Sequence, residues 1–544
     1  MNFQPTRQQM LEVLDQDDVV DLIIIGGGAS GLGIAVDAAT RGFSTILLES
    51  HDFAKGTSSR ATKLVHGGVR YLAQGNITLV REALRERQIL LDNAAHLAQP
   101  LPFVVPGYGF RGCAWDLPIY RTGLALYDAL AKGSHLGKTC YVSRQTLLQE
   151  SPQIQHNKLC GGVRYWDGQF DDARLSVALA RTAIQAGATV LNYCRVTKFL
   201  KADSPRGHGH ITGVVVEDQE TKRIFSIRGK CVVNAAGVWA DSVRRLDDPC
   251  AMKTLAPSQG AHIVVDRSFF PSQQALLVPK TTDGRVMFAV PWMGKVILGT
   301  TDIPRDDLPV EPRPLPTEID FILEEASRYL AHAPQRSDIR AAWAGLRPLV
   351  QKPHHNDTDT KQISREHIIR VSEHGLVTVS GGKWTTYRAM AEDVLLACFS
   401  HNLLPSKTPG VTKTLRLVGS PSPKAPNISL ADPPGLHLYG SEIEQVLALP
   451  GSNHELLPGL SEAMVRFAVR HEYARTVEDV LARRSRWLFL DAQAASDAAD
   501  AVGHILQEEI GSSFNGDASV KSFRALASEY QVAPHPRPNS PSMP

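Results

Sequence analysis

The chain has 544 residues, of which 43% are hydrophobic and 21% are charged, and this composition is typical of soluble globular proteins. It excludes global disorder, and the length indicates about three to four domain-sized units. The formal net charge of +2 is too small to indicate nucleic acid as a partner, since such binding normally needs a concentrated basic face.

The cysteines and the apolar runs exclude further classes. The seven cysteines lie far apart and form no CxxC pair, so we expect neither a structural metal site nor a disulfide framework. The chain is polar up to Val19, which predicts no secretion signal. No apolar run reaches the roughly 18 residues that a membrane span needs, so any membrane contact is expected to be peripheral.

The first motif predicts a dinucleotide site. The apolar run Leu22–Ile25 predicts a buried parallel strand, followed by a glycine turn, a helix over Ala29–Thr40 and a second strand that ends at Glu49. Glu49 is expected on a ribose diol, and its charge argues against NADP, but the spacing does not separate NAD from FAD. The glycines of this GxGxxG turn are Gly26, Gly28 and Gly31.

The next segment, "TSSRATKLVHGGVRYL" (57–72), is basic and rich in small residues. No Asp or Glu occurs between Asp52 and Glu82. Such a segment is suited to close contact with anionic groups. Further on, Cys113–Gly133 combines many large apolar residues with few charges, and it is either a membrane-surface helix or a core helix.

The middle of the chain predicts more of a doubly wound sheet. Asp171–Tyr193 has the pattern of a helix followed by a strand. Cys231–Asp241 and Leu376–Leu395 each combine a short strand with a glycine turn, and an amphipathic helix follows the second turn. Between them, the runs "HIVVD", "VMFAV" and "KVILGT" predict an antiparallel sheet.

These segments together resemble the FAD-dependent, quinone-linked sn-glycerol-3-phosphate dehydrogenases. The matching pieces follow the family's order from Asp21 to about Arg486. They are "DLIIIGGGASGLGIAVDAATRGFSTILLE", "GTSSRATKLVHGGVRYL", "DGQFDDARL", "NAAGVWAD", "GAHIVVD", "PWMGKVILGTTD", "AGLRPLV", "SGGKWTTYR" and "VRHEYARTVEDVLARRSR".

The resemblance implies an α/β fold with a glutathione-reductase-like FAD-binding Rossmann domain, an inserted antiparallel-sheet substrate domain and a C-terminal helical cap domain. The discontinuous FAD domain is expected at 15–95, 170–245 and 340–400, and the substrate domain at 96–169 and 246–339. A linker (401–434), the cap (435–528) and a disordered tail (529–544) are expected to follow.

The resemblance also implies the substrate side of the site. Arg70 and Arg347 are expected to clamp a phosphate, because the guanidinium fork matches phosphate oxygens, with Tyr71 as a neighbour. His262 is the first candidate for the general base, and His66 is the competing base or a flavin neighbour. Lys383 either lies in the same pocket or stabilises charge on the reduced flavin.

On the cofactor side, non-covalent FAD is expected against the glycine turns and the first half of the basic segment. Besides the GxGxxG glycines and Glu49, the expected contacts are Ser58, Ser59, Lys63, Gly67, Gly237, Gly381, Gly382 and Thr385.

The implied reaction is the oxidation of sn-glycerol 3-phosphate to dihydroxyacetone phosphate, with electrons passed to a membrane quinone. A glycerol-3-phosphate oxidase that uses oxygen, another amine-oxidising flavoprotein, and a flavin-binding scaffold without turnover are the alternatives. The expected place is the cytoplasmic face of a bacterial inner membrane, bound peripherally. A mitochondrial inner membrane and a homodimer stay open.

Overall fold

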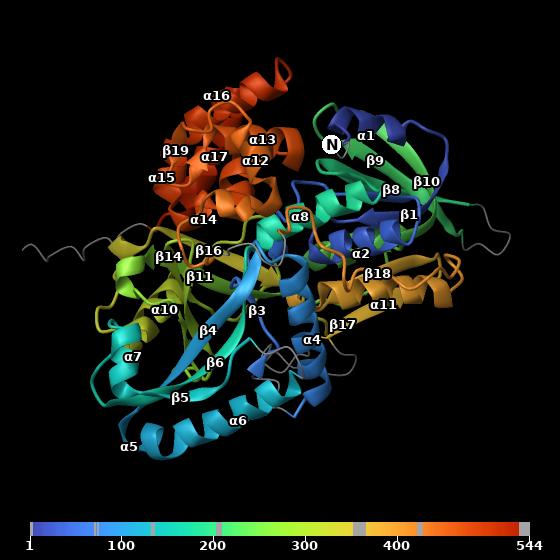
Figure 1. Ribbon diagram of the computed structural model, residues 1–544. Coiled ribbons are helices and arrows are strands. Elements are labelled where there is room, and N and C mark those ends of the chain that lie inside the picture. The colour runs from blue at the N-terminus through green and yellow to red at the C-terminus, as the bar shows by residue number, and fades with distance from the viewer. Residues whose placement is uncertain are drawn as a thin grey trace, which may run out of the picture.

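Figure 1 shows the computed structural model, which describes residues 4–69, 72, 75–131, 136–202, 209–351, 366–421 and 428–532. Two bodies built around sheets lie next to each other, and a helical body that contains α13 to α17 packs over both. This arrangement confirms the expected fold class. Arg70, Tyr71 and most of the expected C-terminal tail lie outside the described residues.

The first sheet is parallel at its centre, as the glycine motif predicts. Strand β1 lies between β10 and β2 and runs parallel to both, and β10 also runs parallel to β18. The order is β17-β18-β10-β1-β2-β7, with β9 antiparallel to the first half of β10 and β8 antiparallel to β9. The strands are β1 (Val19–Ile25), β2 (Thr45–Leu48), β7 (Thr189–Leu191), β8 (Cys194–Lys201), β9 (Ile211–Asp218), β10 (Ile224–Asn234), β17 (His367–Val371) and β18 (Leu376–Gly381).

Helices cover this sheet. Helix α2 has the predicted bounds and packs against α8 and α11. It is apolar nearly all round, which suits a helix enclosed by a sheet and two neighbours. The helices of this body are α1 (Arg7–Leu14), α2 (Ala29–Thr40), η1 (Thr57–Ser59), α8 (Asp172–Gln185), η3 (Gly237–Trp239), α9 (Ala240–Asp247), η7 (Trp384–Thr386) and α11 (Tyr387–Ser400).

The second sheet is mostly antiparallel, as predicted. Its order is β15-β11-β14-β13-β12-β4-β6-β3, with β16 beside β11 and β5 beside β6, and only the β12–β4 pair is parallel among these described strands. The strands are β3 (Leu64–Val65), β4 (Ala98–Tyr108), β5 (Cys140–Ser143), β6 (Leu159–Phe170), β11 (Ser258–Asp266), β12 (Ala275–Val278), β13 (Met287–Trp292), β14 (Lys295–Gly299), β15 (Ile303–Pro304) and β16 (Ala341–Arg347).

The helices of this second body flank its sheet and reach the far edge of the molecule (Figure 1). They are α4 (Ile77–Asn93), α5 (Gly109–Arg111), η2 (Gly112–Asp116), α6 (Leu117–Leu130), α7 (Arg144–Glu150), η4 (Arg267–Phe269), α10 (Pro316–Tyr329) and η5 (Arg336–Asp338).

The cap is helical, as expected, but it also contains a two-stranded hairpin. Helix α17 ends at Tyr530, so the chain stays ordered past the boundary expected at 528. The elements are η8 (Leu436–Glu442), α12 (Ile443–Leu447), β19 (Glu455–Leu457), β20 (Leu460–Ser461), α13 (Glu462–Glu472), η9 (Asp479–Arg484), α14 (Trp487–Leu490), α15 (Ala492–Asp497), α16 (Ala499–Ile510) and α17 (Gly516–Tyr530).

Two sequence expectations need correction. Strand β16, expected in the FAD domain that resumes at 340, pairs along its length with β11 of the second sheet. The apolar pattern of β16 predicts a buried strand, but it does not indicate which sheet the strand joins. Cys113 and Cys160 form a disulfide, although no disulfide framework was expected, because partners 47 residues apart show no sequence signal. Among the described residues, no helix is both long and apolar enough to span a membrane.

Candidate active site

A cavity of about 580 Å³ opens at the carboxyl ends of the parallel strands β1, β2, β10 and β18. This is where doubly wound sheets bind ligands. Its wall contains eight residues of the expected site, together with residues of β8 that the sequence did not single out. The eight residues are Gly26, Gly28, Glu49, Ser58, Gly237, Gly381, Gly382 and Lys383.

The N-terminus of α2 faces this cavity. Gly26 has φ +110°, and a Cβ on Gly31 would stand 1.9 Å from the Gly26 oxygen, so the close turn requires glycine at both positions. Gly28 caps the helix without a side chain, and the Ser58 Oγ accepts a hydrogen bond from the Ala29 N–H at 2.9 Å. The helix end therefore offers backbone N–H groups and a hydroxyl to a phosphate.

Glu49 holds the other side of the glycine turn. Its Oε2 accepts from the Gly27 N–H at 2.6 Å, and its Oε1 accepts from the His51 N–H at 2.8 Å. The carboxylate is thus fixed at the cavity wall, at the end of the second strand, where the motif places a ribose diol.

The later glycine turns form the opposite wall. Gly237, Gly381 and Gly382 all have positive φ, between +58° and +82°, a backbone conformation that favours glycine. Trp384, which the sequence analysis did not single out, donates its indole N–H to the Ser58 carbonyl at 2.8 Å. The indole therefore joins the two walls of the cavity.

Five expected cofactor contacts lie outside the cavity wall, and the first of them is Gly31, which packs against the Gly26 oxygen. Lys63 is fully buried, and its ammonium donates to Asp172 at 2.7 Å and to the Ser59 carbonyl at 2.8 Å. Burial lowers the pKa of Lys63 to about 7, although Asp172 acts in the opposite direction. The Gly67 N–H donates to the Tyr127 hydroxyl at 2.7 Å, and the Thr385 hydroxyl bonds the His66 backbone. The fifth residue is Ser59.

This geometry gives Ser59, Lys63, Gly67 and Thr385 supporting contacts behind the wall. Direct contact of these four residues with a cofactor remains a prediction, because none of them lies in the cavity wall. Asp172, the partner of Lys63, was missed because it lies 109 residues further along the chain.

His262 lies on β11 in a closed environment. Its Nε2 is 3.0 Å from the Thr62 hydroxyl, and its ring stacks on Trp343 with centroids 5.2 Å apart. Burial, followed by the charges of Lys63 and Arg347, lowers the pKa of His262 well below its ordinary value. The imidazole is therefore neutral at pH 7. Its Nδ1 is buried and has no hydrogen-bond partner among the described residues.

Arg347 lies at the end of β16, opposite the start of β11. Its guanidinium donates to the Thr300 hydroxyl at 3.1 Å and to the Thr301 carbonyl at 3.0 Å, and it pairs with Asp302 at 3.3 Å. Gly260 leaves room for it, since a Cβ there would stand 2.2 Å from Nη2.

In the pairing of β11 with β16, His262 lies opposite Trp343 and Arg347 lies opposite Ser258, and the charge of Arg347 acts on His262. The residue after Arg347, Pro348, lines the cavity. Lys383 lies in the cavity wall itself. His66 adjoins this region through its backbone bonds with Thr385. Of the described catalytic candidates, only Lys383 lies in the cavity wall, and a shared site with His262, Arg347 and His66 stays a prediction.

Comparisons with known proteins agree with this architecture. A family model described as FAD dependent oxidoreductase matches residues 21–388. A second model, described as the C-terminal domain of alpha-glycerophosphate oxidase, matches residues 435–515. The two matches cover the sheet-containing bodies and most of the cap.

The chain is also similar to named proteins. The mitochondrial glycerol-3-phosphate dehydrogenases of Macaca fascicularis and Homo sapiens are each 41% identical to it over 93% of this chain and 72% of theirs. The structure of the glycerol-3-phosphate dehydrogenase from Bacillus halodurans complexed with FAD has a TM-score of 0.75, with 30% identity over 97% of both chains. L-alpha-glycerophosphate oxidase from Mycoplasma pneumoniae, with FAD bound, shares the fold at a TM-score of 0.54 and 17% identity, over 74% of this chain and 99% of its own.

Proposed function

Because this chain belongs to the FAD-dependent glycerol-3-phosphate dehydrogenases, within the FAD-dependent oxidoreductases, we propose that it oxidises sn-glycerol 3-phosphate and passes the electrons to a membrane quinone. The observation that supports the proposal is the cavity walled by Gly26, Glu49 and Lys383, in a chain whose strands β11 and β16 carry His262 and Arg347. FAD fits the cavity, because the α2 N-terminus suits a pyrophosphate and Glu49 suits a ribose.

We assign a role in the reaction to His262, Arg347 and Lys383. FAD supplies the hydride acceptor when it is bound. His262, which is neutral at pH 7, accepts the proton of the substrate hydroxyl, since a base must be unprotonated to act. Arg347 binds the substrate phosphate, with Arg70 and Tyr71 as further candidates outside the described residues. Lys383 contributes positive charge to the cavity.

A membrane quinone as electron acceptor implies that the protein contacts a membrane surface. We propose that the segment from α5 to α6 makes this contact. The segment from α5 to α6 carries Phe110, Trp115, Ile119 and Leu126, whose exposed fractions range from 50% to 84%. The opposite side of α6 is buried through Leu117, Leu124 and Tyr127. A helix that is apolar on both sides, at the edge of the molecule farthest from the cap, suits insertion into a lipid surface (Figure 1).

The main experiment is anaerobic reduction. The purified protein should show the absorbance of bound flavin, and adding sn-glycerol 3-phosphate without oxygen should bleach that band. Glycerol without phosphate serves as the control. A flavin band that persists with the phosphorylated substrate would overturn the substrate assignment.

The second candidate function is a glycerol-3-phosphate oxidase. The match of residues 435–515 to the C-terminal domain of alpha-glycerophosphate oxidase favours it. The two candidates differ in where the electrons go. Peroxide formed in proportion to substrate would support the oxidase, whereas quinone reduction with little peroxide would support the quinone-linked dehydrogenase.

A further inference from the structure

The loop of residues 51–63, here called the cofactor loop, has two sides. One side lines the cavity through His51, Ala54 and the run from Lys55 to Ser58. The other side is buried against residues 475–486 of the cap, which come more than 400 positions later. The shape of the cavity wall therefore depends on contacts made from a different domain.

The first contact is at the start of the cofactor loop. Asp52 is fully buried and forms ion pairs with Arg483 and Arg484, and it also accepts from the Asn192 amide at 3.1 Å. Burial raises the pKa of Asp52, but the charges of Arg484 and Arg483 outweigh this effect and lower the pKa below its ordinary value. Asp52 is therefore charged, and its charge is balanced by two arginines of the cap.

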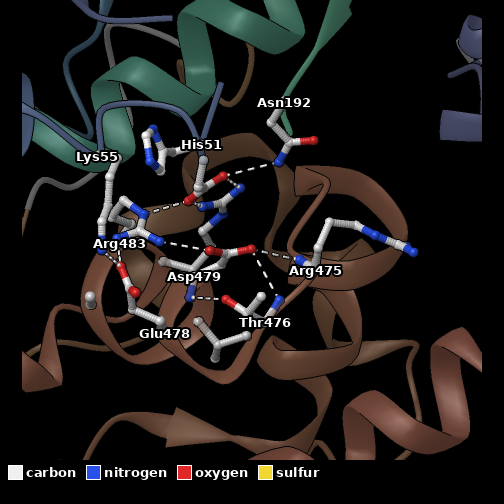
Figure 2. Close-up of polar contacts among 12 residues, drawn as sticks. His51, Lys55, Asn192, Arg475, Thr476, Glu478, Asp479 and Arg483 are labelled. Carbon is white, nitrogen blue, oxygen red and sulfur yellow. Dashed lines mark hydrogen bonds and ion pairs between the residues drawn. The ribbon is translucent and has the colours of Figure 1, made fainter. Parts of the chain in front are cut away.

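The second contact is in the middle of the cofactor loop. Glu478 of the cap bridges Lys55 of the loop and Arg483, and the Arg483–Glu478 distance is 2.5 Å (Figure 2). Arg483 also pairs with Asp479 at 2.6 Å. Lys55, which itself lines the cavity, has its ammonium held by Glu478 and by Glu311.

The third contact is at the end of the cofactor loop. Arg486 is fully buried and donates to the Ser59 carbonyl at 2.8 Å and to Asp172 at 3.0 Å. The same Asp172 accepts from the Ala61 N–H at 3.0 Å and from Lys63 at 2.7 Å. Arg486 and Asp172 together fix the backbone from Ser59 to Lys63.

From these three contacts we propose that Arg483, Arg484 and Arg486 are positioning residues for FAD: by holding the cofactor loop from behind, they keep its Lys55–Ser58 wall in the shape that retains the dinucleotide. None of the three lies in the wall of the cavity. They act through Asp52, Glu478 and Ser59, and they couple docking of the cap to cofactor retention.

The test uses the full-length holoenzyme and compares Arg484→Gln and Arg486→Gln with a matched control, Arg181→Gln. Arg181 forms a buried bidentate ion pair with Glu442 of the cap at 2.6 Å, and in the described chain neither side chain bonds to the cofactor loop. Each change therefore breaks a buried ion pair with the cap. Arg484→Gln breaks the pair with Asp52 of the cofactor loop, and Arg486→Gln and Arg181→Gln each break a pair between α8 and the cap.

The measurement is the rate of FAD release after dilution, followed by the rise of flavin fluorescence, alongside the melting temperature. Arg484→Gln and Arg486→Gln should release FAD at least about tenfold faster, since affinity changes appear mainly in dissociation rates. Arg181→Gln should lower the melting temperature and leave the release rate within about twofold. Purification of either test variant without flavin, while the control keeps it, also supports the proposal.

The proposal would be overturned if Arg484→Gln and Arg486→Gln released FAD at the rate of the unaltered enzyme. It would also be overturned if Arg181→Gln released FAD as fast as they do. If neither arginine variant folds, Glu478→Gln takes their place, because it keeps the shape of a partly exposed side chain and removes only its charge. An unchanged release rate in Glu478→Gln would then count against the proposal. Arg484→Lys should give an intermediate rate, since it keeps the charge beside Asp52 but loses the fork. No substrate is needed, so the result is independent of the proposed reaction.

Discussion

At the scale of single residues, the environment of His262 sets its protonation. The ring is enclosed by Trp343 and Thr62, and two cations act on it, so the neutral form persists to low pH. An exposed imidazole would instead gain a proton near pH 6.5. Burial therefore favours the unprotonated form of His262, which is the form that a general base must have before the reaction.

We expect His262→Asn to lower kcat by roughly 10²- to 10⁴-fold, the usual contribution of a general base. In the unaltered enzyme, kcat/KM should not fall as pH decreases through 6.5, because the lowered pKa moves that protonation to more acidic pH. A pH profile of both proteins from 5 to 8 checks this. A bound flavin spectrum that is unchanged in the variant serves as the folding control.

Arg347→Ala should raise KM for sn-glycerol 3-phosphate by the equivalent of about 2–5 kcal/mol, since it removes one partner of a charged pair. The control is Arg340→Ala, at the other end of the same strand region, where an exposed guanidinium pairs with Asp266 at 2.6 Å. Steady-state kinetics on both variants measure the effect. The same KM in Arg347→Ala and the unaltered enzyme would remove Arg347 from the phosphate site.

At the scale of elements, we propose that the segment of η2 and α6 contacts a lipid surface. Changing Trp115 and Ile119 together to Ser should reduce binding to anionic lipid vesicles several-fold, because each removes apolar area available for insertion. Flotation with vesicles measures the bound fraction. Met252→Ser is the control, since Met252 is 82% exposed and lies outside η2 and α6. Equal loss of binding in both variants would contradict a role for α6.

Local elements could be predicted from the sequence, whereas partners far along the chain could not. The bounds of α2 and the strands beside it follow from apolar runs and glycine spacing within one short unit. The ion pair of Lys63 with Asp172 and the placement of β16 in the second sheet depend on long-range pairing. Basic residues in "TSSRATK" therefore suggested an anionic ligand, although Lys63 and Arg60 pair with acids of the protein itself.

The candidate catalytic residues likewise depend on pairing between distant segments, which the sequence pattern does not predict. Nothing in the local sequence joins "GAHIVVD" to "AGLRPLV", and their proximity could be expected only from the family resemblance. In the structure, the antiparallel pairing of β11 with β16 brings them together. Trp384 and the wall formed by β8 were missed because a tryptophan after a glycine turn and a short strand have no distinctive pattern.

At the scale of the whole molecule, cofactor and fold should stabilise each other. A ligand that binds only the folded state stabilises it by about 2.7 kcal/mol when its concentration is 100 times Kd. The melting temperature of the holoenzyme should therefore rise as free FAD is added, and riboflavin, which lacks the pyrophosphate, should raise it less. Thermal melts over a series of FAD concentrations check this, and a flat response would argue against binding in the cavity described.

The order in which the strands of the first sheet occur has a consequence for synthesis on the ribosome. β1 is made early, but its neighbour β10 is complete only at Asn234, and β18 follows at Gly381. Contacts between such distant segments form slowly and late. One edge of β1 therefore stays unpaired until residue 234 of 544 is made, and one edge of β10 stays unpaired until the end of β18 is made, so apolar strand edges are open to aggregation during synthesis.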